Sequence, residues 1–421
     1  MVRVPQAVVI GAGIVGLSSA IQLRRRGLEV IVLEARTVGS GASKGNAGWI
    51  VPALSAPVAA PGAIGYGVRH LMQRSGGFSI RPVPSAAMLH WAARFALSTR
   101  RSVFETGLSA TARFAAGAAR SFADLTASGL ETPVRTSGML IVYDDHARAA
   151  RDLGGYRSLA SFGIAVDDEV LNVAELARLE PALGRSTRAG IRFPNEQYVD
   201  PFQLACDLAR LASREGVVIR EAANVVRLSN PQAPRVHIHG GDTIEHSFVI
   251  VAAGIASVPL AKDLGYQLPM QAGKGYSVTV RPSSDLYSPV YIPSAKAALT
   301  PLKQGLRIAG VMELGAKSTN IAVARLNRMT SLSEQFFAEN FVRRSEETDQ
   351  WAGLRPVTAD SLPVIGPVPG AQKAFIATGH AMLGVTLGPL TGEVIAAQVA
   401  GEVQPLAQAF RPDRFSRKGA Q

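Results

Sequence analysis

A glycine-rich turn and one acid near the start of the chain have the residue types and spacing of a dinucleotide-binding site. Gly11, Gly13 and Gly16 stand in the order GxGxxG, and Glu34 follows roughly twenty residues later. The first two glycines allow a tight turn and let backbone N–H groups approach a pyrophosphate, and the third lets a helix pack closely on a strand. The acid would bind the hydroxyls of an adenosine ribose, which disfavours the 2′-phosphate of NADP.

The elements expected around these residues form a βαβ unit. An apolar run from Ala7 to Ile10 predicts a buried parallel strand, a helix is expected from about Ile14, and Val30 to Leu33 predicts a second strand that ends at the acid. Gly27 is a natural residue just past the end of the helix. Strand, turn, helix, strand and acid therefore follow one another as in a Rossmann-type unit, and an ordinary glycine-rich core turn is the alternative.

A second glycine-rich loop near the far end of the chain helps to choose between the dinucleotides. The expected strand at 374–378 is followed by GHAMLGVT and by a helix with Pro389 in its first turn. A second helix N-terminus would then face the same crevice, where its positive end suits the N1–C2=O edge of a reduced flavin. An NAD enzyme has no evident need for this second site, so the segment favours FAD, with a capped core helix as the alternative.

Length and composition favour a globular protein of two domains. The chain has 421 residues, of which 47% are hydrophobic and 18% are charged. No stretch reaches about eighteen uninterrupted apolar residues, so we expect no transmembrane helix. The single cysteine, Cys206, excludes an intrachain disulfide and a cysteine-rich metal site, and it fits a reducing, cytoplasmic compartment. No metal site is predicted.

The net charge of +12 has two interpretations, a solvated, arginine-rich surface or a surface that binds an anionic partner. An anionic membrane, a nucleic acid and an acidic substrate would all suit it. The basic residues are scattered in runs of three at most, which favours the solvated surface. No RNA-binding module or aromatic–basic cluster is evident, so we expect no nucleic acid partner.

The remaining stretches predict an α/β protein whose first fold is interrupted by a second one. Residues 38–62 predict a functional loop, and residues 86–128 predict two amphipathic helices. Residues 268–345 predict short antiparallel strands and a helix from Phe336 to Arg344. The expected architecture is a Rossmann-type domain, a parallel sheet with flanking helices, and an inserted α+β substrate domain on a mostly antiparallel sheet. The first domain comprises 1–85, 197–265 and 346–421, and the second comprises 86–196 and 266–345.

Seven segments in sequence order resemble one known family. They are VVIGAGIVGLSSA, the NAGWIVP and APG loop, VDPFQL, VIVAAG, GKGYSVTV, GLRPVTADSLPVIG and GHAMLGVT, between residue 8 and about residue 400. On these segments the chain resembles the D-amino acid oxidase superfamily of FAD-dependent oxidoreductases, and within it the bacterial D-amino acid dehydrogenases of the small-subunit type. GLRPVT…PVIG together with GH…LG is the most specific part.

The resemblance implies where FAD would lie. It puts the ADP half on Gly11, Ala12, Gly13, Ile14, Val15, Gly16, Glu34, Ala35 and Arg36. It puts Ser43, Lys44, Asn46, Ala47 and Gly48 along the flavin, and Leu383, Gly384, Val385 and Thr386 against its ring. Val225 would meet the adenine through its backbone, and Ala253 and Gly254 would meet the diphosphate.

The resemblance also implies the substrate site. Arg355 matches the arginine that binds a substrate carboxylate, and Trp49 falls where the family often has a substrate-contacting side chain. Tyr276 and Tyr291, on expected strands, are candidates for a hydroxyl to the carboxylate or for the pocket wall, and each is equally a candidate for a packed sheet residue. His380 lies next to the flavin loop and is expected to hydrogen-bond there rather than act as a base. Lys44 and Lys274 are further charges expected near the site.

Two departures from the family affect these expectations. Relatives that hold flavin covalently use a cysteine in the C-terminal half, whereas Cys206 falls in an expected helix of the first domain, so FAD should be non-covalent. Relatives that oxidise glycine have a second arginine in the GH loop, where this chain has Met382. The carboxylate site therefore has fewer evident partners, which leaves substrate size and charge open.

The activity implied is oxidative deamination of D-amino acids to 2-oxo acids and ammonia, with hydride transfer to flavin N5 and electrons passed to a quinone-type acceptor. The alternatives are oxidation of secondary amines such as glycine, sarcosine, proline or hydroxyproline, a role as one subunit of a hetero-oligomer, and an RNA-modifying flavoprotein. We expect a cytoplasmic protein, with peripheral contact to the inner face of the cytoplasmic membrane left open. The stereochemistry, the acceptor and the oligomeric state remain open from sequence alone.

Overall fold

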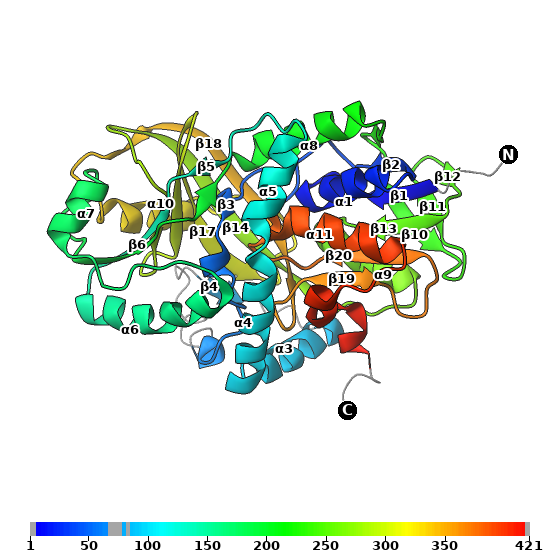
Figure 1. The fold of residues 1–421 in the computed structure, drawn as a ribbon, viewed down its shortest axis with the longest axis horizontal. Helices are drawn as coiled ribbons and strands as arrows, with labels where there is room; N and C mark the ends of the chain where they lie inside the picture. Colours follow the sequence, from blue (N-terminus) through cyan, green and yellow to red (C-terminus); the bar gives the residue numbers. More distant parts are fainter. Residues whose placement is uncertain (1–5, 66–77, 81–84, 417–421) are drawn as a thin grey trace.

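Two sheets set side by side organise the protein. The structure is a computed structural model that describes residues 6–65, 78–80 and 85–416, without the side chains of 78–80 and 343–348. A six-stranded sheet lies on the right in Figure 1 and an eight-stranded sheet on the left. The expected α/β architecture, a Rossmann-type sheet with a second, mostly antiparallel sheet, is confirmed.

The six-stranded sheet brings four strand ends to one edge. Its order is β19-β20-β13-β1-β2-β9, and all neighbours are parallel except β19 and β20. The bounds are β1 (Gln6–Ile10), β2 (Glu29–Leu33), β9 (Val218–Arg220), β13 (Phe248–Val251), β19 (Val364–Pro367) and β20 (Ala374–Thr378). Because β1, β2, β13 and β20 run the same way, the loops that follow them meet at the carboxyl edge, where such sheets bind ligands.

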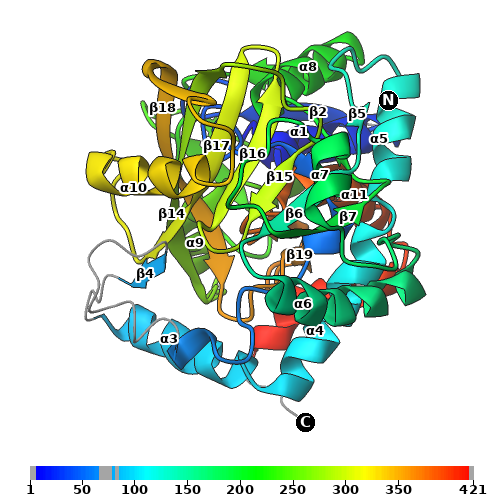
Figure 2. The same cartoon turned by 90° about the vertical axis from the view of Figure 1, so that its left-hand side faces the viewer.

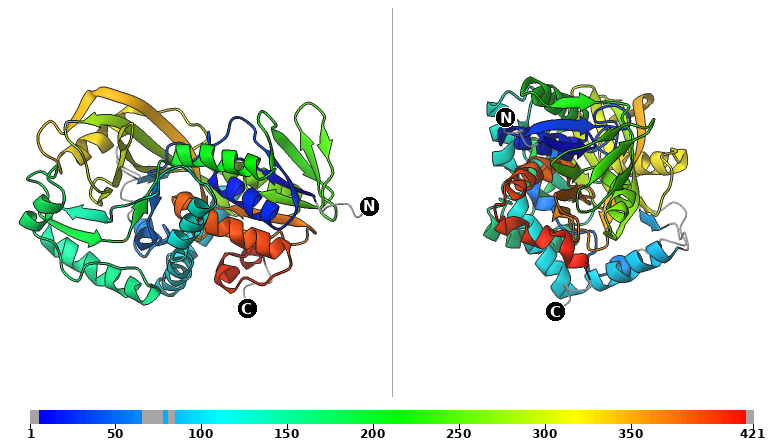
Figure 3. Two further views of the ribbon diagram at one scale, coloured as in Figure 1. Left: turned by 45° about the horizontal axis from the view of Figure 1, so that its top comes forward. Right: turned by 90° about the vertical axis from the view of Figure 1, so that its right-hand side faces the viewer.

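Two helices from opposite ends of the chain pack against each other on this sheet. Figure 3 (left) shows α1 (Ile14–Arg25) alongside α11 (Gly384–Val399). A Cβ on Gly388 would lie 2.7 Å from Ile14 Cγ2, and one on Gly392 would lie 2.6 Å from the Ser18 carbonyl oxygen. Both N-termini therefore reach the carboxyl edge together. Pro389 lies inside α11 rather than in its first turn as predicted, because the helix already begins at Gly384.

The eight-stranded sheet is mostly antiparallel and is built largely from the second half of the chain. Its strands are β18 (Val342–Thr358), β14 (Met270–Pro282), β17 (Gly305–Leu314), β16 (Ala297–Leu302), β15 (Val290–Ile292), β6 (Met139–Tyr143) and β7 (Ala189–Phe193), with β4 (Phe78–Ile80) paired to β17. The predicted helix from Phe336 to Arg344 is wrong. Its N-terminal part is a turn and its C-terminal part begins β18, while the helix of this region is α10 (Val323–Glu334).

The two faces of the eight-stranded sheet carry different residues, since side chains alternate along each strand. One face carries apolar side chains that form a core with α10, among them Val278, Leu299 and Ile308. The other face carries the intervening residues, including Thr279, Arg307 and Thr300, which are aligned across β14, β17 and β16. This polar face contacts the loop that follows β2, as the site below shows.

Helices cover the remaining surfaces. They are α3 (Ala86–Ser98), α4 (Arg101–Ala115), α5 (Ala118–Ala127), α6 (His146–Arg157), α7 (Val173–Leu179), α8 (Pro201–Arg214) and α9 (Ser257–Asp263). Region 86–128 thus holds three helices, not the two predicted. Phe114, Phe122 and Leu125 of α4 and α5 join the core around α1 and α11. In Figure 2, α6 lies below β6 and β7, which it contacts, and α3 lies at the lower edge, where it contacts α4 and β14.

Two small sheets and five short 3-10 helices complete the described fold. The sheets are β10 (Val225–Ser229), β11 (Arg235–Ile238) and β12 (Thr243–Ile244), and β3 (Trp49–Ile50), β8 (Gln197–Tyr198) and β5 (Arg135–Thr136). The 3-10 helices are η1 (Pro52–Leu54), η2 (Ser158–Phe162), η3 (Gly254–Ala256), η4 (Pro405–Phe410) and η5 (Pro412–Phe415). No helix of the described residues is long and apolar enough to cross a bilayer.

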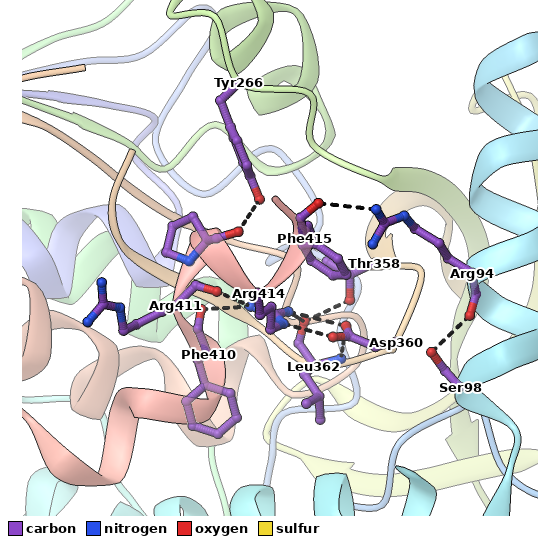
Figure 4. Close-up of polar contacts among 11 residues, drawn as sticks. Arg94, Ser98, Tyr266, Thr358, Asp360, Leu362, Phe410, Arg411, Arg414 and Phe415 are labelled. Carbon is purple, nitrogen blue, oxygen red and sulfur yellow. Dashed lines mark hydrogen bonds and ion pairs between the residues drawn. The ribbon is translucent and has the colours of Figure 1, made fainter. Parts of the chain in front are cut away.

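A cluster of hydrogen bonds fixes the C-terminal 3-10 helices to the end of β18 (Figure 4). Arg414 makes a bidentate ion pair with Asp360 and also donates to the Leu362 carbonyl. Thr358 donates to the same carbonyl, and Arg94 of α3 donates to the carbonyl of Phe415. The end of β18, three residues beyond Arg355, is therefore held from several directions.

The predicted division into two domains stays a prediction, but some of its boundaries do not coincide with the two sheets. β18 crosses the predicted boundary at 345/346 and belongs to the eight-stranded sheet up to Thr358. Likewise, α4 and α5 were assigned to the substrate domain but pack on the core of the six-stranded sheet. The part of the chain that belongs to the eight-stranded sheet therefore ends at Thr358.

Candidate active site

The glycine turn after β1 has the tight geometry that a pyrophosphate site needs. Gly11 has a φ of +109°, and a Cβ there would lie 2.6 Å from the Ala252 carbonyl oxygen. A Cβ on Gly16 would lie 2.0 Å from the carbonyl oxygen of Gly11. Both positions thus require glycine, one for its backbone conformation and the other for the close approach of α1 to the turn.

The end of β2 presents an acid beside this turn. The Glu34 carboxylate accepts hydrogen bonds from the backbone N–H of Ala12, at 2.9 Å, and of Arg36, at 3.0 Å. The backbone of Ala223 donates to the Glu34 carbonyl, which brings the start of β10, Val225, to the same edge. Ala35 and Arg36 are exposed there. The structure therefore brings the residues expected around the adenosine together.

Two helix N-termini at this edge have no cap from the side chain of the preceding residue, which fits FAD. The residues before α1 and α11, Gly13 and Leu383, make no side-chain cap hydrogen bond, and neither first turn contains an acid. The Ile14 N–H donates to Ser43 Oγ at 3.4 Å, which leaves the N–H groups of the following residues for a ligand and adds a hydroxyl beside α1. Gly254, after β13, has a φ of +56° and open space where a Cβ would point. Uncapped N–H groups of this kind bind anionic groups such as a diphosphate.

The loop of residues 43–48 connects the two sheets. Asn46 accepts from the Gly48 nitrogen at 2.8 Å and donates to the Met382 carbonyl at 3.4 Å. Thr386, in the first turn of α11, donates to the Trp49 carbonyl at 2.9 Å. Ala47 is held by Thr300 of β16, whose hydroxyl donates to its carbonyl at 2.8 Å. The predicted flavin-contacting segments at 43–48 and 383–386 thus lie next to each other.

Arg307 of β17 holds this loop, a role that was not predicted from the sequence. Its Nη1 donates to the carbonyls of Lys44, at 3.0 Å, and Asn46, at 3.4 Å, and its guanidinium also contacts Thr279. It is 4% exposed, and burial lowers the pKa of Arg307. Its alternation with other polar residues on an apolar strand was the one available signal.

We expect Arg307→Lys to weaken FAD binding about tenfold, because one ammonium cannot replace a planar group that reaches two carbonyls and a hydroxyl. FAD affinity is measured by fluorescence titration of the apoenzyme. Arg235→Lys, in the exposed pair with Glu245, is the control and should leave affinity unchanged. Equal affinities for all three proteins would contradict the role of Arg307.

Arg355 is a buried cation on the polar face of the eight-stranded sheet. It is 7% exposed, and burial lowers its pKa to about 10. Its Nη1 donates to the Val311 carbonyl at 3.0 Å, and its guanidinium lies flat over Gly275, where a Cβ would be 2.0 Å from Nη1. No acid of the described residues pairs with it. A buried, unpaired guanidinium is suited to an anionic ligand, so the placement agrees with the predicted carboxylate site.

The structure contradicts the site roles predicted for Tyr276 and Lys274. Side chains alternate along β14, so both point to the face opposite Gly275 and Arg355. Tyr276 is fully buried and donates to Glu313, and Lys274 Nζ lies 5.1 Å from the centre of the tyrosine ring. Tyr276 is thus the packed sheet residue that was the alternative.

Trp49 and Tyr291 lie together beside the loop. Their rings meet edge to face with centroids 6.1 Å apart, and Trp49 Nε1 donates to Thr300 at 2.8 Å. Both are partly exposed. A third aromatic, Trp351, was not predicted. Its indole packs on Gly45 and Gly353, where added Cβ atoms would lie 2.1 and 2.0 Å from it. Trp351, Gly353 and Arg355 alternate along β18, so this aromatic shares the face of the arginine.

His380 is buried against α11 and does not have the properties of a base. Its Nε2 is 2.9 Å from Thr391 Oγ1, and because that hydroxyl donates to the Leu387 carbonyl, Nε2 is the donor. Burial lowers the pKa of His380 to about 3. The ring is therefore neutral at working pH, as expected for a hydrogen-bonding loop residue.

We expect His380→Gln to keep activity within about twofold at pH 6–9, because an amide can replace the donor and no proton transfer is lost. Stability should change with pH. The free group has a pKa of 6.5 and the folded one about 3. Wild-type stability therefore falls as pH falls through this window, by up to about 1.4 kcal/mol per pH unit, and the variant should lose that contribution. Thermal midpoints at pH 7.5 and 5 test this, and a hundredfold loss of activity would instead indicate a base.

Three further side chains considered in the sequence, Lys44, Cys206 and Met382, have different surroundings. Lys44 Nζ is 5.8 Å from the ring of Phe202 in α8. Cys206 is in α8 as predicted, and burial raises the pKa of its thiol. Met382 is 47% exposed. Non-covalent FAD, which was predicted from the position of Cys206, stays a prediction.

Comparisons with known proteins agree with this arrangement. A sequence model of the family described as "DAO: FAD dependent oxidoreductase" matches residues 6–398. The chain is 31% identical to a "D-amino acid dehydrogenase" of Rhizorhabdus wittichii over 412 residues, covering 94% of this chain and 96% of that protein. It is 30% identical to a protein of the same name in Allorhizobium ampelinum over 403 residues, covering 93% and 94%.

Solved structures share the fold at lower identity. Glycine oxidase from Geobacillus kaustophilus superposes with a TM-score of 0.75 at 20% identity, covering 98% of this chain and 99% of that chain. L-proline dehydrogenase from P. horikoshii superposes with a TM-score of 0.75 at 20% identity, covering all of both chains. Since the family model spans most of the chain and the resemblance inferred from the motifs is confirmed, this protein belongs to the DAO family of FAD-dependent oxidoreductases.

Proposed function

We propose that this protein oxidises D-amino acids to 2-oxo acids and ammonia and passes the electrons to an acceptor other than oxygen. The observation that carries the substrate class is Arg355, a buried guanidinium without an acid partner among the described residues, on the face that contacts the cofactor loop. A guanidinium in this setting suits a ligand that carries a carboxylate. The D configuration and the dehydrogenase reaction rest on the names of the two relatives at about 30% identity.

The side chains would act by binding and orienting the substrate. FAD, when bound along Gly11–Gly16, Glu34, 43–48 and 383–386, supplies the hydride acceptor. Arg355 would bind the carboxylate through two parallel N–H donors, which fixes both position and tilt. Trp49, Tyr291 and Trp351 would exclude water around the substrate. The imine product hydrolyses in solution, so no catalytic base is assigned, in agreement with the neutral His380.

Secondary or unsubstituted amines remain the second candidate substrates. Solved structures that share the fold are named glycine oxidase and L-proline dehydrogenase. Glycine, sarcosine, proline and hydroxyproline also carry a carboxylate, so Arg355 does not discriminate against them. In this alternative the protein could also act as one subunit of a hetero-oligomer.

The test is anaerobic mixing of the holoenzyme with D- and L-amino acids, glycine, sarcosine and D- and L-proline, while flavin absorbance is followed. We expect D-amino acids to bleach the flavin fastest. The reduced enzyme is then mixed with air or with a quinone, and we expect the quinone to reoxidise it faster. Bleaching by L-proline or sarcosine alone would replace the proposed substrate, and hydrogen peroxide formed in step with 2-oxo acid would make the protein an oxidase.

Peripheral contact with an anionic membrane would bring the protein to lipid-soluble quinones. Leu89 and Leu97 of α3 are 69% and 52% exposed, several alanines between them are exposed, and Arg100 and Arg101 follow. An apolar helix face flanked by cations suits the surface of an anionic bilayer.

We expect the double variant Leu89→Glu/Leu97→Glu to stop flotation with anionic liposomes at low salt, because two carboxylates would enter the apolar face. Val403→Glu, at an exposed apolar side chain elsewhere, is the control. Wild-type protein that does not float with anionic vesicles would remove the membrane contact and leave the substrate proposal untouched.

A further inference from the structure

A β-bulge lies directly beneath the guanidinium of Arg355. Lys274 pairs with Glu313 and Tyr276 pairs with Gly310, so Gly275 faces two residues of β17, Val311 and Met312. Val311 has a φ of +58°. A β-branched residue rarely adopts this conformation, and the surrounding structure must impose it.

The bulge has a direct consequence for the arginine. The strained residue turns its carbonyl toward the guanidinium, where Arg355 Nη1 donates to it at 3.0 Å. Gly275, opposite the bulge, leaves room for the guanidinium to lie flat on the strand. Among the described residues this carbonyl is the only hydrogen-bond acceptor of Arg355. The orientation of the proposed carboxylate site therefore depends on the bulge keeping its shape.

A buried charged cluster holds the bulge from the opposite face of the sheet. Glu313, two residues after Val311, is fully buried and accepts a hydrogen bond from the hydroxyl of Tyr276. Arg325 Nε of α10 lies 3.4 Å from the same carboxylate. Lys274 Nζ donates to the Asn320 carbonyl at 2.8 Å. The cluster thus links both strands on either side of the bulge to α10 and to the loop before it.

We infer that Lys274, Tyr276, Glu313 and Arg325 form a positioning cluster that sets the affinity of Arg355 for the substrate carboxylate through the bulge at Val311. The cluster does not touch the substrate, because it lies on the opposite face of the sheet. It accounts for charged residues in an otherwise apolar core, where burial of charge is costly unless it is paired. The inference rests on the proposed function, since it assumes that Arg355 binds a carboxylate.

The experiment compares holoenzymes of the wild type, Glu313→Gln, Tyr276→Phe and Arg355→Lys. The probe is benzoate, a carboxylate without an oxidisable amine, and its dissociation constant is measured from the change in flavin absorbance. KM and kcat for D-alanine are measured beside it. Glu180→Gln is the matched control, because Glu180 is also fully buried beside the same sheet but accepts from Tyr287 and Ser288, away from the bulge.

We expect Glu313→Gln to raise the dissociation constant of benzoate and the KM about tenfold, with kcat and FAD affinity unchanged. Tyr276→Phe should raise the dissociation constant of benzoate and the KM about threefold. If Glu313→Gln yields no holoenzyme, the result for Tyr276→Phe tests the inference by itself. Glu180→Gln should change neither. Two results would overturn the inference and leave the proposed function standing. In the first, Arg355→Lys weakens benzoate binding but the cluster variants do not. In the second, Glu180→Gln weakens benzoate binding as much as the cluster variants do. A wild type that binds no carboxylate overturns the proposed function with it.

Discussion

Replacing Arg355 by leucine is expected to abolish measurable substrate binding while the protein stays at least as stable as the wild type. The guanidinium is 7% exposed and has a backbone carbonyl as its only acceptor among the described residues, so the free enzyme carries the cost of an unpaired buried charge. An apolar side chain removes that cost. It also leaves the substrate carboxylate unpaired, which we expect to raise KM a hundredfold or more.

The two halves of this prediction are measured separately. Thermal midpoints of the FAD-loaded proteins report stability, and steady-state kinetics with D-amino acids report binding. The KM of Arg355→Lys should lie between those of the wild type and Arg355→Leu. We expect substrate binding to be weaker than in the wild type by about 1.5–3 kcal/mol, because a point charge replaces a bidentate pair. An amine of similar size without a carboxylate is the control substrate, and its turnover should not respond to either substitution. Wild-type KM in the leucine variant would remove Arg355 from the site.

Gly16→Ala is expected to have the second large effect, on the cofactor rather than on the substrate. The new Cβ would lie 2.0 Å from the carbonyl oxygen of Gly11, which is backbone and cannot turn away. Either α1 must move from the sheet or the turn must open, and both changes misplace the N–H groups for the diphosphate. We expect FAD affinity to fall at least about a hundredfold, or about 3 kcal/mol.

Gly41→Ala is the matched control for this substitution. Gly41 lies in the loop after β2, is exposed, has no other atom within 4 Å of an added Cβ and does not have a positive φ. It should keep its FAD, as judged by the ratio of flavin to protein absorbance after gel filtration. A yellow Gly16→Ala protein with wild-type affinity would show that the turn tolerates a side chain and would contradict the packing argument.

The dinucleotide-binding unit could be predicted because its determinants are local. Gly11, Gly16 and Glu34 lie within one βαβ unit, and each has a backbone or hydrogen-bonding reason that follows from its residue type. The second helix at the carboxyl edge was also found from a glycine-rich loop followed by an apolar helix. Pairing of β1 with β13 and of β13 with β20 then follows from the usual order of parallel sheets.

The eight-stranded sheet was predicted less well because its faces are set by long-range register. Tyr276 and Lys274 have suitable chemistry and stand in a motif that resembles the family, yet alternation along β14 turns them away from Arg355. A shift of one residue in the strand register turns a side chain to the opposite face of the sheet, and no local sequence signal determines this register. Arg307 was missed for the same reason, since its partners Lys44 and Asn46 are more than 250 residues away in sequence.

The failed helix prediction has a related cause. The segment from Phe336 contains apolar residues at helical spacing, but Phe337 and Phe341 stack on each other and pack under the sheet. Tertiary packing overrides the local pattern there. Val342 already begins a strand that pairs along the whole length of β14.

The packing of α11 on α1 also has a consequence for biosynthesis. The first βαβ unit leaves the ribosome long before the glycine face that covers α1, which consists of Gly388 and Gly392. The strand β20 is made only shortly before these two glycines. Until then the apolar side of α1 lacks its partner. The α1 helix must therefore wait for the synthesis of residues 26–383 before α11 can cover it, and we expect FAD to be retained only after α11 emerges. Ribosome-bound chains stalled before residue 384 should accordingly be sensitive to protease across α1, whereas chains that extend past α11 should be protected.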